Sequence, residues 1–262
     1  MSDAVLYSVA GGVASVEINR PDAMNAADAA VRAGLREAFT QAADDPDVRA
    51  VLVSGAGDRA FCVGQDLKEL LPLYESDDPD LGGIVAGFND VAVALTELPK
   101  PTVACVNGAA AGAGASLAFA CDFRVAADTA SFAMAFSKIG LVPDTGASWT
   151  LPRLVGEAKA LEMLLLSEPV RAEEALRLGL VTRVVPAASV REEAAAFARS
   201  LAEGPTVAYG YIKRLVAMSA RSTLAESLEC EAELQAAAGR TEDHVNAVRS
   251  FLAKERPTFR GY

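Results

Sequence analysis

The chain has 262 residues, 52% of them hydrophobic, and a formal net charge of −11. This composition supports a substantial core and is unlike that of a disordered chain, while the acidic balance disfavours nucleic-acid backbones, which bind basic faces. No apolar run approaches the roughly 20 residues of a membrane span, and residues 1–10 lack the basic start and apolar stretch of a signal peptide, so we expect a cytoplasmic protein with neither nucleic acid nor a membrane as partner.

As far as residue 185 the chain alternates strand-like and helical patterns. Val5–Ala10 and Val13–Ile18 predict a hairpin around two glycines, and 26–43 predicts an amphipathic helix with apolar residues at spacing four. Further short buried strands are predicted at 51–54, 103–106, 123–126 and 181–185, and further helices at 83–98, 114–120, 158–167 and 172–178. Strands that alternate with helices indicate an α/β fold.

After Pro186 the pattern becomes wholly helical. Four helices are predicted, at 190–203, 206–219, 224–238 and 242–254, with Gly204-Pro205 as a break between the first two. We therefore divide the chain into a core domain at residues 1–200 and a helical region at residues 201–262.

Cysteine and histidine usage limits the possible chemistry. The four cysteines, Cys62, Cys105, Cys121 and Cys230, show no metal or redox spacing, so mostly buried, reduced thiols are expected. His244 is the only histidine, which removes multi-histidine metal sites and disfavours a Ser-His-Asp triad. It follows Thr241, a good N-cap, so we expect a surface position near a helix start. No metal site is predicted.

Two turns of small residues each follow a strand-like run. The first is Phe61-Cys62-Val63-Gly64-Gln65-Asp66-Leu67, and the second runs from Asn107 to Gly114. Gly and Ala leave room for a backbone N–H to face a ligand, and two such donors on one oxygen form an oxyanion hole for carbonyl chemistry. The glycines match dinucleotide fingerprints only in part, and no P-loop lysine follows them.

The two turns resemble the signature segments of the crotonase (enoyl-CoA hydratase/isomerase) superfamily. The likeness covers 61–67 and 101–122, and extends upstream to Ile18-Asn19-Arg20-Pro21 with Asn25 and downstream to 136–144. It implies a crotonase-type spiral of β-β-α turns with a C-terminal helical oligomerisation region. It also implies an acyl-CoA thioester substrate, a homotrimer or a hexamer built as a dimer of trimers, and no cofactor other than the coenzyme A of the substrate.

The resemblance assigns the oxyanion donors to the backbone N–H groups of Gln65 and Ala113. The second donor begins a helix, whose positive end favours developing negative charge. Hydratases of this superfamily carry two carboxylates, at the positions of Ser116 and Phe136. Hydration needs a base for water and an acid for the α-carbon, and neither Ser nor Phe can replace that pair. Ordinary hydratase activity is therefore disfavoured.

Asp144 is another candidate base. It lies among apolar and turn residues, a setting that can raise the pKa of a carboxyl toward neutrality. The pattern equally allows Asp144 to cap a helix beginning near Gly146, and the residues alone leave both interpretations open. The segment 135–144 resembles the isomerases of the phenylacetate pathway, which rearrange a ring epoxide and shift enoyl-CoA double bonds, and this resemblance makes Asp144 the catalytic carboxylate. Related dehalogenases also need an upstream histidine, which is absent.

Coenzyme A contacts are implied only by the resemblance. The positions that match are Ala23, Asn25, Ala60, Phe61, Gly64, Asp66, Leu67, Gly112, Phe136, Phe251 and Lys254, the groove residues largely through their backbone. Phe251 and Lys254 match positions that reach the phosphates, in some relatives across a subunit boundary. Lys254 could equally be a solvated lysine at a helix end.

The sequence therefore predicts a cytoplasmic, cofactor-free acyl-CoA isomerase. Gln65 and Ala113 would polarise the thioester carbonyl, and Asp144 would move the proton. One alternative is a low-activity enoyl-CoA hydratase of fatty-acid β-oxidation that uses water and Asp144 alone. Another is a non-catalytic or RNA-binding protein of the same fold, which the intact turns and the acidic charge disfavour.

Overall fold

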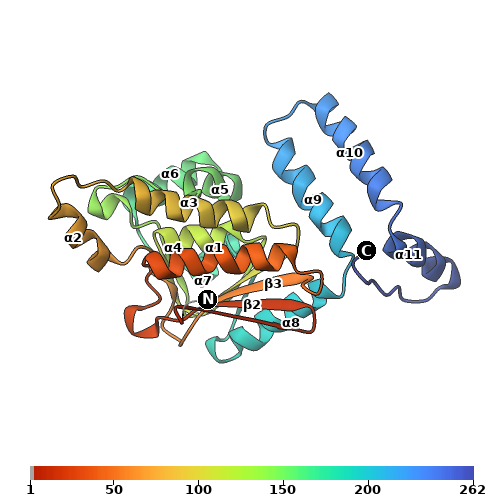
Figure 1. Cartoon of the computed structure of the whole chain (residues 1–262), viewed down its shortest axis with the longest axis horizontal. Helices are drawn as coiled ribbons and strands as arrows, with labels where there is room; N and C mark the ends of the chain where they lie inside the picture. The colour runs from red at the N-terminus through yellow and green to blue at the C-terminus, as the bar shows by residue number, and fades with distance from the viewer. Residues whose placement is uncertain (1–2) are drawn as a thin grey trace.

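Two β-sheets form the body of the protein in a computed structural model that describes residues 3–262 (Figure 1). The larger sheet has the strand order β1-β2-β3-β5-β7-β10 and the smaller sheet has the order β4-β6-β8-β9. The strands of the larger sheet are β1 Val5–Ala10, β2 Val13–Ile18, β3 Ala50–Gly55, β5 Thr102–Val106, β7 Phe123–Ala127 and β10 Arg183–Val185. Those of the smaller sheet are β4 Ala60–Cys62, β6 Ala109–Ala111, β8 Ser131–Ala133 and β9 Val170–Arg171.

The larger sheet is mostly parallel. β1 and β2 form the predicted antiparallel hairpin, and β2, β3, β5, β7 and β10 then pair in parallel. Every residue of β5 is buried, as expected for a parallel strand covered on both faces. This explains why the sequence shows continuous apolar runs here in place of alternation.

Three consecutive segments repeat one pattern. Each places a strand in the larger sheet, then a short strand in the smaller sheet, and then continues into helix: β3 and β4, β5 and β6, and β7 and β8. Within each sheet these strands lie side by side in parallel. The chain therefore winds as a spiral of β-β-α turns, and the end of each short strand leads into the loops that form the site.

Helices cover the sheets on both sides. α1 and α3 pack together and lie across the body in Figure 1, and α8 packs against β3 and β5. The helices of the body are α1 Ala29–Asp44, α2 Leu70–Tyr74, α3 Gly82–Thr96, α4 Ala113–Ala120, α5 Ala147–Val155, α6 Glu157–Leu166, α7 Ala172–Arg177 and α8 Val190–Ala202. Short 3-10 turns lie at Pro21–Ala23, Leu67–Glu69, Ser137–Ile139 and Ala187–Ser189.

The start of α1 differs from the prediction. The helix begins at Ala29 and not at residue 26, because Asp28 is its N-cap and accepts a hydrogen bond from the N–H of Val31 at 3.0 Å. Ala27, just before the cap, forms an isolated parallel β-bridge with Gln65. The residues assigned to the helix from their apolar spacing are thus extended, and they contact the first small-residue turn.

The last three helices form an arm that projects from the body (Figure 1). They are α9 Thr206–Ser219, α10 Leu224–Ala238 and α11 Glu242–Ala253. Lys213 anchors α9 to the body through an ion pair with Asp122 at 2.7 Å. Farther out the arm exposes large apolar side chains, including Val216, Leu228 and Phe251.

Other features of the chain follow the sequence analysis. All four cysteines are buried, and burial raises the pKa of the Cys62 thiol to about 11. Thr241 caps α11 by accepting from the N–H of His244 at 3.1 Å, and His244 is exposed. Among residues 3–262 no helix combines the length and the apolar character that crossing a membrane requires.

Candidate active site

A cavity of about 590 Å³ lies where the two small-residue turns, α3 and the loop before α5 meet. Its walls are apolar and come from widely separated parts of the chain. They include Val63, Leu67, Leu70, Leu81, Ile84, Val85, Phe88, Ala135, Phe136, Ile139, Leu141, Val142 and Pro143. Gln65, Ala113 and Asp144 line the same cavity. The structure thus brings together the three residues to which the sequence assigns chemistry.

The first turn leaves the backbone N–H of Gln65 without an acceptor within residues 3–262. Gly64 donates its N–H to Cys62 Sγ at 3.4 Å and its carbonyl accepts from Ala27 at 2.7 Å, while Asp66 donates its N–H to the carbonyl of Ala27 at 3.0 Å. Backbone groups alternate direction along an extended chain, so Gln65, between these contacts, directs its N–H away from Ala27. The N–H of Gln65 is therefore available to a ligand, and Gln65 lines the cavity.

The second turn supplies another donor. Ala113 is the first residue of α4, and its N-cap Gly112 makes no side-chain cap, so the N–H of Ala113 has no acceptor within the helix. The two turns touch: a Cβ added to Gly64 would lie 3.2 Å from Ala113 N and 2.9 Å from Ala111 O. Only glycine fits between them without a shift, and the close approach brings Gln65 and Ala113 to the same cavity.

Asp144 contributes a carboxyl group to the apolar side of the cavity. It does not cap α5, because that helix begins at Ala147 with Gly146 as N-cap and no side-chain cap. Its one side-chain partner within residues 3–262 is the hydroxyl of Thr145, which donates to Oδ1 at 2.7 Å. Burial raises the pKa of Asp144 above its ordinary value, and this hydrogen bond opposes the rise. The geometry therefore favours the base over the helix cap.

The loop that carries Asp144 is conformationally unusual. Thr145 is 1% exposed and has a φ of +53°, a region that β-branched residues rarely adopt. Gly146 continues the left-handed path with a φ of +76°. Strained backbone of this kind is often found at functional sites, where the surrounding structure over-determines it. Here it turns the chain between the carboxyl group and α5.

The two positions that carry carboxylates in hydratases have other uses here. The side chain of Ser116 is buried and donates to the carbonyl of Gly112 at 3.1 Å. Phe136 is 6% exposed and forms part of the cavity wall. Asp144 is consequently the one acidic or basic residue that lines the cavity in the described part of the chain.

The residues assigned to coenzyme A binding differ widely in solvent exposure. Four of them line the cavity: Gly64, Leu67, Gly112 and Phe136. Two others, Ala23 and Asp66, are half-buried and do not line it. Asn25, Ala60 and Phe61 are almost completely buried. The side chain of Asn25 accepts a hydrogen bond from Arg20 N at 3.0 Å and donates to Ala56 O and Ala60 O at 3.0 and 2.9 Å. Burial therefore disfavours a direct ligand contact from these three residues, and the side chain of Asn25 instead joins the backbone of neighbouring loops.

Phe251 and Lys254 lie elsewhere. Both belong to the end of α11, in the arm, at the opposite side of the molecule from α2 (Figure 1). Neither lines the cavity, and Phe251 is 81% exposed. A single chain therefore does not bring these two residues to the candidate site.

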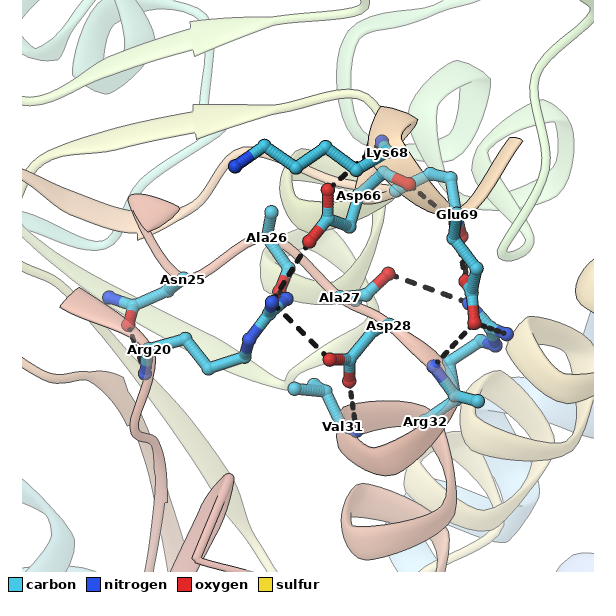
Figure 2. Close-up of polar contacts among 12 residues, drawn as sticks. Arg20, Asn25, Ala26, Ala27, Asp28, Val31, Arg32, Asp66, Lys68 and Glu69 are labelled. Atoms are coloured by element: carbon cyan, nitrogen blue, oxygen red, sulfur yellow. Dashed lines mark hydrogen bonds and ion pairs between the residues drawn. The ribbon is translucent and has the colours of Figure 1, made fainter. Parts of the chain in front are cut away.

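A polar network outside the cavity was not foreseen from the sequence. Figure 2 shows Arg32, Asp66 and Glu69 around the first turn, with Arg20 and Asp28 beside them. Arg32 lies on α1 and is 7% exposed. In the sequence, Arg32 stands out only as a basic residue on a helix face that is otherwise rich in apolar residues. The spacing of residues along the chain does not show which acidic side chain it pairs with.

No group of three or more His, Cys, Asp or Glu side chains that could hold an ion occurs within residues 3–262.

Comparison with known proteins identifies relatives along the whole chain. The profile of the family described as Enoyl-CoA hydratase/isomerase matches residues 8–262. The 1,2-epoxyphenylacetyl-CoA isomerase of Escherichia coli (strain K12) is 40% identical over 262 residues, which is 100% of both chains. The trans-2-decenoyl-[acyl-carrier-protein] isomerase of Streptococcus mutans is 34% identical, over 98% of both chains. The crystal structure of an enoyl-CoA hydratase from Polaromonas sp. JS666 has a TM-score of 0.92 at 33% identity, over 97% of this chain and 99% of that one.

Proposed function

Because this chain belongs to the enoyl-CoA hydratase/isomerase family and has its α/β crotonase fold, we propose that it is an acyl-CoA isomerase. It would shift a double bond, or rearrange a ring epoxide, in a coenzyme A thioester through an enolate. The observation that carries the proposal is the composition of the cavity. Gln65 and Ala113, which would supply the two main-chain donors, line the cavity together with Asp144, the one carboxyl group in its lining among residues 3–262.

Each part of this arrangement has a role in a proton transfer. The N–H groups of Gln65 and Ala113 would bind the thioester oxygen and stabilise the negative charge that develops on it. Asp144 would take a proton from a carbon near the thioester as general base. The same carboxyl group, now protonated, would return the proton to another carbon of the conjugated system. The proton is conserved, and neither a cofactor nor water is consumed.

Hydration would require more than this site supplies. Addition of water needs a base for the water and an acid for the α-carbon, and Ser116 and Phe136 occupy the two positions expected for them. A hydratase that relies on Asp144 alone is the second candidate, supported by structural likeness to an enoyl-CoA hydratase. We place it second because a single carboxylate suits an isomerisation, in which Asp144 takes up a proton and then returns it.

The lining of the cavity also limits the acyl group. Apolar side chains, including the rings of Phe88 and Phe136, form most of its walls. An acyl group with its own carboxylate would lose hydration there and face the carboxylate of Asp144 without a cation to pair with, which is costly. We therefore expect neutral, apolar acyl groups, either unsaturated chains or rings. The relative from Escherichia coli, a 1,2-epoxyphenylacetyl-CoA isomerase, supports a ring.

We further propose that the active form is a homotrimer or a hexamer. Large apolar side chains are exposed on all three helices of the arm, among them Val216, Leu228 and Phe251, and such surface is typical of association sites between copies of a chain. Assembly would also explain the distant position of Phe251 and Lys254, because a second copy could bring them to the coenzyme A end of the site. Both residues remain candidates for the phosphates on that basis.

The decisive experiment replaces Asp144 by Asn. This change keeps the size of the side chain and removes the base, so turnover of a 3-enoyl-CoA to its conjugated 2-enoyl isomer should fall by about 100-fold or more. Binding of the acyl-CoA should change little, since both donors remain. Ser116→Ala is the control and should be mild. A near-normal rate for Asp144→Asn would reject the mechanism, and a large loss in Ser116→Ala alone would revive the hydratase.

A further inference from the structure

Arg32 and Glu69 form an ion pair directly behind the first small-residue turn. Arg32 Nη1 lies 2.9 Å from Glu69 Oε2, and the arginine side chain is 8% exposed against 27% for the glutamate. A buried arginine is costly unless its donors are satisfied. Here Nη1 and Nη2 donate to Gln65 Oε1 and to both carboxylate oxygens of Glu69, beside the turn that carries the candidate oxyanion donor (Figure 2).

Both members of the pair also bind the side chain of Gln65. Arg32 Nη1 donates to Gln65 Oε1 at 2.8 Å, and Gln65 Nε2 donates to Glu69 Oε2 at 2.7 Å. Each end of the glutamine amide is therefore held by an opposite charge, and charge-assisted hydrogen bonds are stronger than neutral ones. This three-membered contact fixes the side chain of the residue whose backbone N–H faces the cavity.

The pair is tied to the surrounding elements as well. Glu69 Oε1 accepts from the N–H of Ala29, at the start of α1, at 3.0 Å. The guanidinium of Arg32 lies 5.3 Å from the ring centre of Phe88, on α3, which is part of the cavity wall. The pair thus connects α1, the first turn and α3. Burial alone would raise the pKa of Glu69, but the hydrogen bonds from Arg32 and Gln65 outweigh it, so the pKa lies below its ordinary value.

We propose that Arg32 and Glu69 are positioning residues, which hold the turn so that the N–H of Gln65 points at the thioester oxygen. Neither residue lines the cavity, so neither needs to touch the substrate. This inference rests on the proposed acyl-CoA chemistry of the same cavity. An oxyanion donor works only within a narrow range of distance, and a side-chain clamp on its own residue limits rotation of that peptide group.

The test compares Arg32→Met with Lys100→Met. Both native residues are 7% exposed, and both anchor α1: Lys100 donates to Ala42 O and Asp45 O, at 2.6 and 2.5 Å, at the far end of the helix. Arg32→Met should lower kcat about tenfold with KM nearly unchanged, a fraction of the roughly 100- to 1000-fold cost of losing an oxyanion donor. Lys100→Met should lower the unfolding temperature by about as much as Arg32→Met does, and its kcat should be unchanged.

A spectroscopic readout separates this inference from the proposed function. A bound conjugated thioester such as cinnamoyl-CoA should absorb at longer wavelength when its carbonyl is polarised. Asp144→Asn should keep this red shift, and Arg32→Met should reduce it. If the wild-type protein shows neither turnover nor a red shift, the proposed function fails. If both are present and Arg32→Met retains them in full, only the positioning role fails.

Two further variants guard against misfolding of Arg32→Met. Glu69→Gln keeps the shape of the half-exposed partner but turns an amide group toward donors, so it should reduce kcat and the red shift in the same way. Arg32→Lys keeps a cation near Glu69 and should recover part of both. Full activity in Glu69→Gln, or no difference between Arg32→Lys and Arg32→Met, would overturn the proposal.

Discussion

Replacement of Gly64 by Ala should damage catalysis far more than stability. Gly64 has a φ of +89°, and an alanine in a left-handed conformation costs about 1–2 kcal/mol. A Cβ at this position would lie 2.9 Å from Ala111 O and 3.2 Å from Ala113 N. Carbon contacts are optimal only from about 3.5 Å. The two turns must therefore move apart by about half an ångström to accept the methyl group.

This movement acts directly on the proposed oxyanion hole. Ala113 N is one of its donors, and such donors act at about 2.7–3.1 Å from the charged oxygen. Complete loss of one donor costs about 100- to 1000-fold in kcat. Because displacement by half an ångström weakens the donor without removing it, we expect Gly64→Ala to lower kcat by about 10- to 100-fold, a smaller loss than for a missing donor.

Gly179→Ala is the matched control. Gly179 has a φ of +77°, and the nearest atom to an added Cβ is Leu154 O at 3.9 Å, so this variant carries the backbone cost without the steric one. Both variants should lose the backbone share of stability in thermal unfolding, and Gly64→Ala should lose more because of its steric contacts; only Gly64→Ala should lose isomerase turnover and the red shift of bound cinnamoyl-CoA. Equal kcat values for the two variants would refute the reasoning.

Three predictions remain. Burial raises the pKa of Asp144, and a base acts only when it is deprotonated. As the pH is lowered, kcat should therefore begin to fall at a pH above the ordinary pKa range of carboxyl groups. A pH–rate profile whose acid limb lies within that ordinary range would contradict this. A raised carboxyl pKa stabilises the fold at low pH and loses that contribution as pH rises through the folded-state pKa. Asp144→Asn should therefore gain free energy of unfolding over wild type at neutral pH but not below the ordinary carboxyl range, as measured by denaturant titration at both. Light scattering at micromolar concentration should give three or six times the 27.2 kDa of one chain, and a monomer mass would reject the assembly.

Much of the larger sheet could be predicted from the sequence, because long apolar runs and helical spacing report burial directly. The hairpin of β1 and β2 has the predicted bounds. The smaller sheet could not be predicted, since β4, β6 and β8 are three residues each, too short to show a period. Ala109–Ala111 is read equally well as a turn, and only its neighbours on either side make it a strand.

The candidate site divides in the same way. Gln65, Ala113 and Asp144 were selected from local motifs and a family resemblance, and the cavity unites them. The interaction of Arg32 with Glu69 joins residues far apart in sequence, and no local pattern encodes such a contact. The role of Asn25 shows the opposite limit: the motif marked the residue, but only the structure shows that its side chain is consumed by the backbone of neighbouring loops.

The β-bridge between Ala27 and Gln65 has a consequence for how this chain can vary. A donor held by backbone pairing belongs to the peptide group, so a replacement of Gln65 would keep the N–H itself and lose only the side-chain clamp proposed to aim it; proline alone would abolish the donor, since it has no N–H. Side chains that line the cavity could therefore change with the acyl group. The proposed backbone donors to the thioester oxygen depend instead on the path of the chain. New substrate preferences could arise by single replacements without rebuilding the electrophilic half of the site.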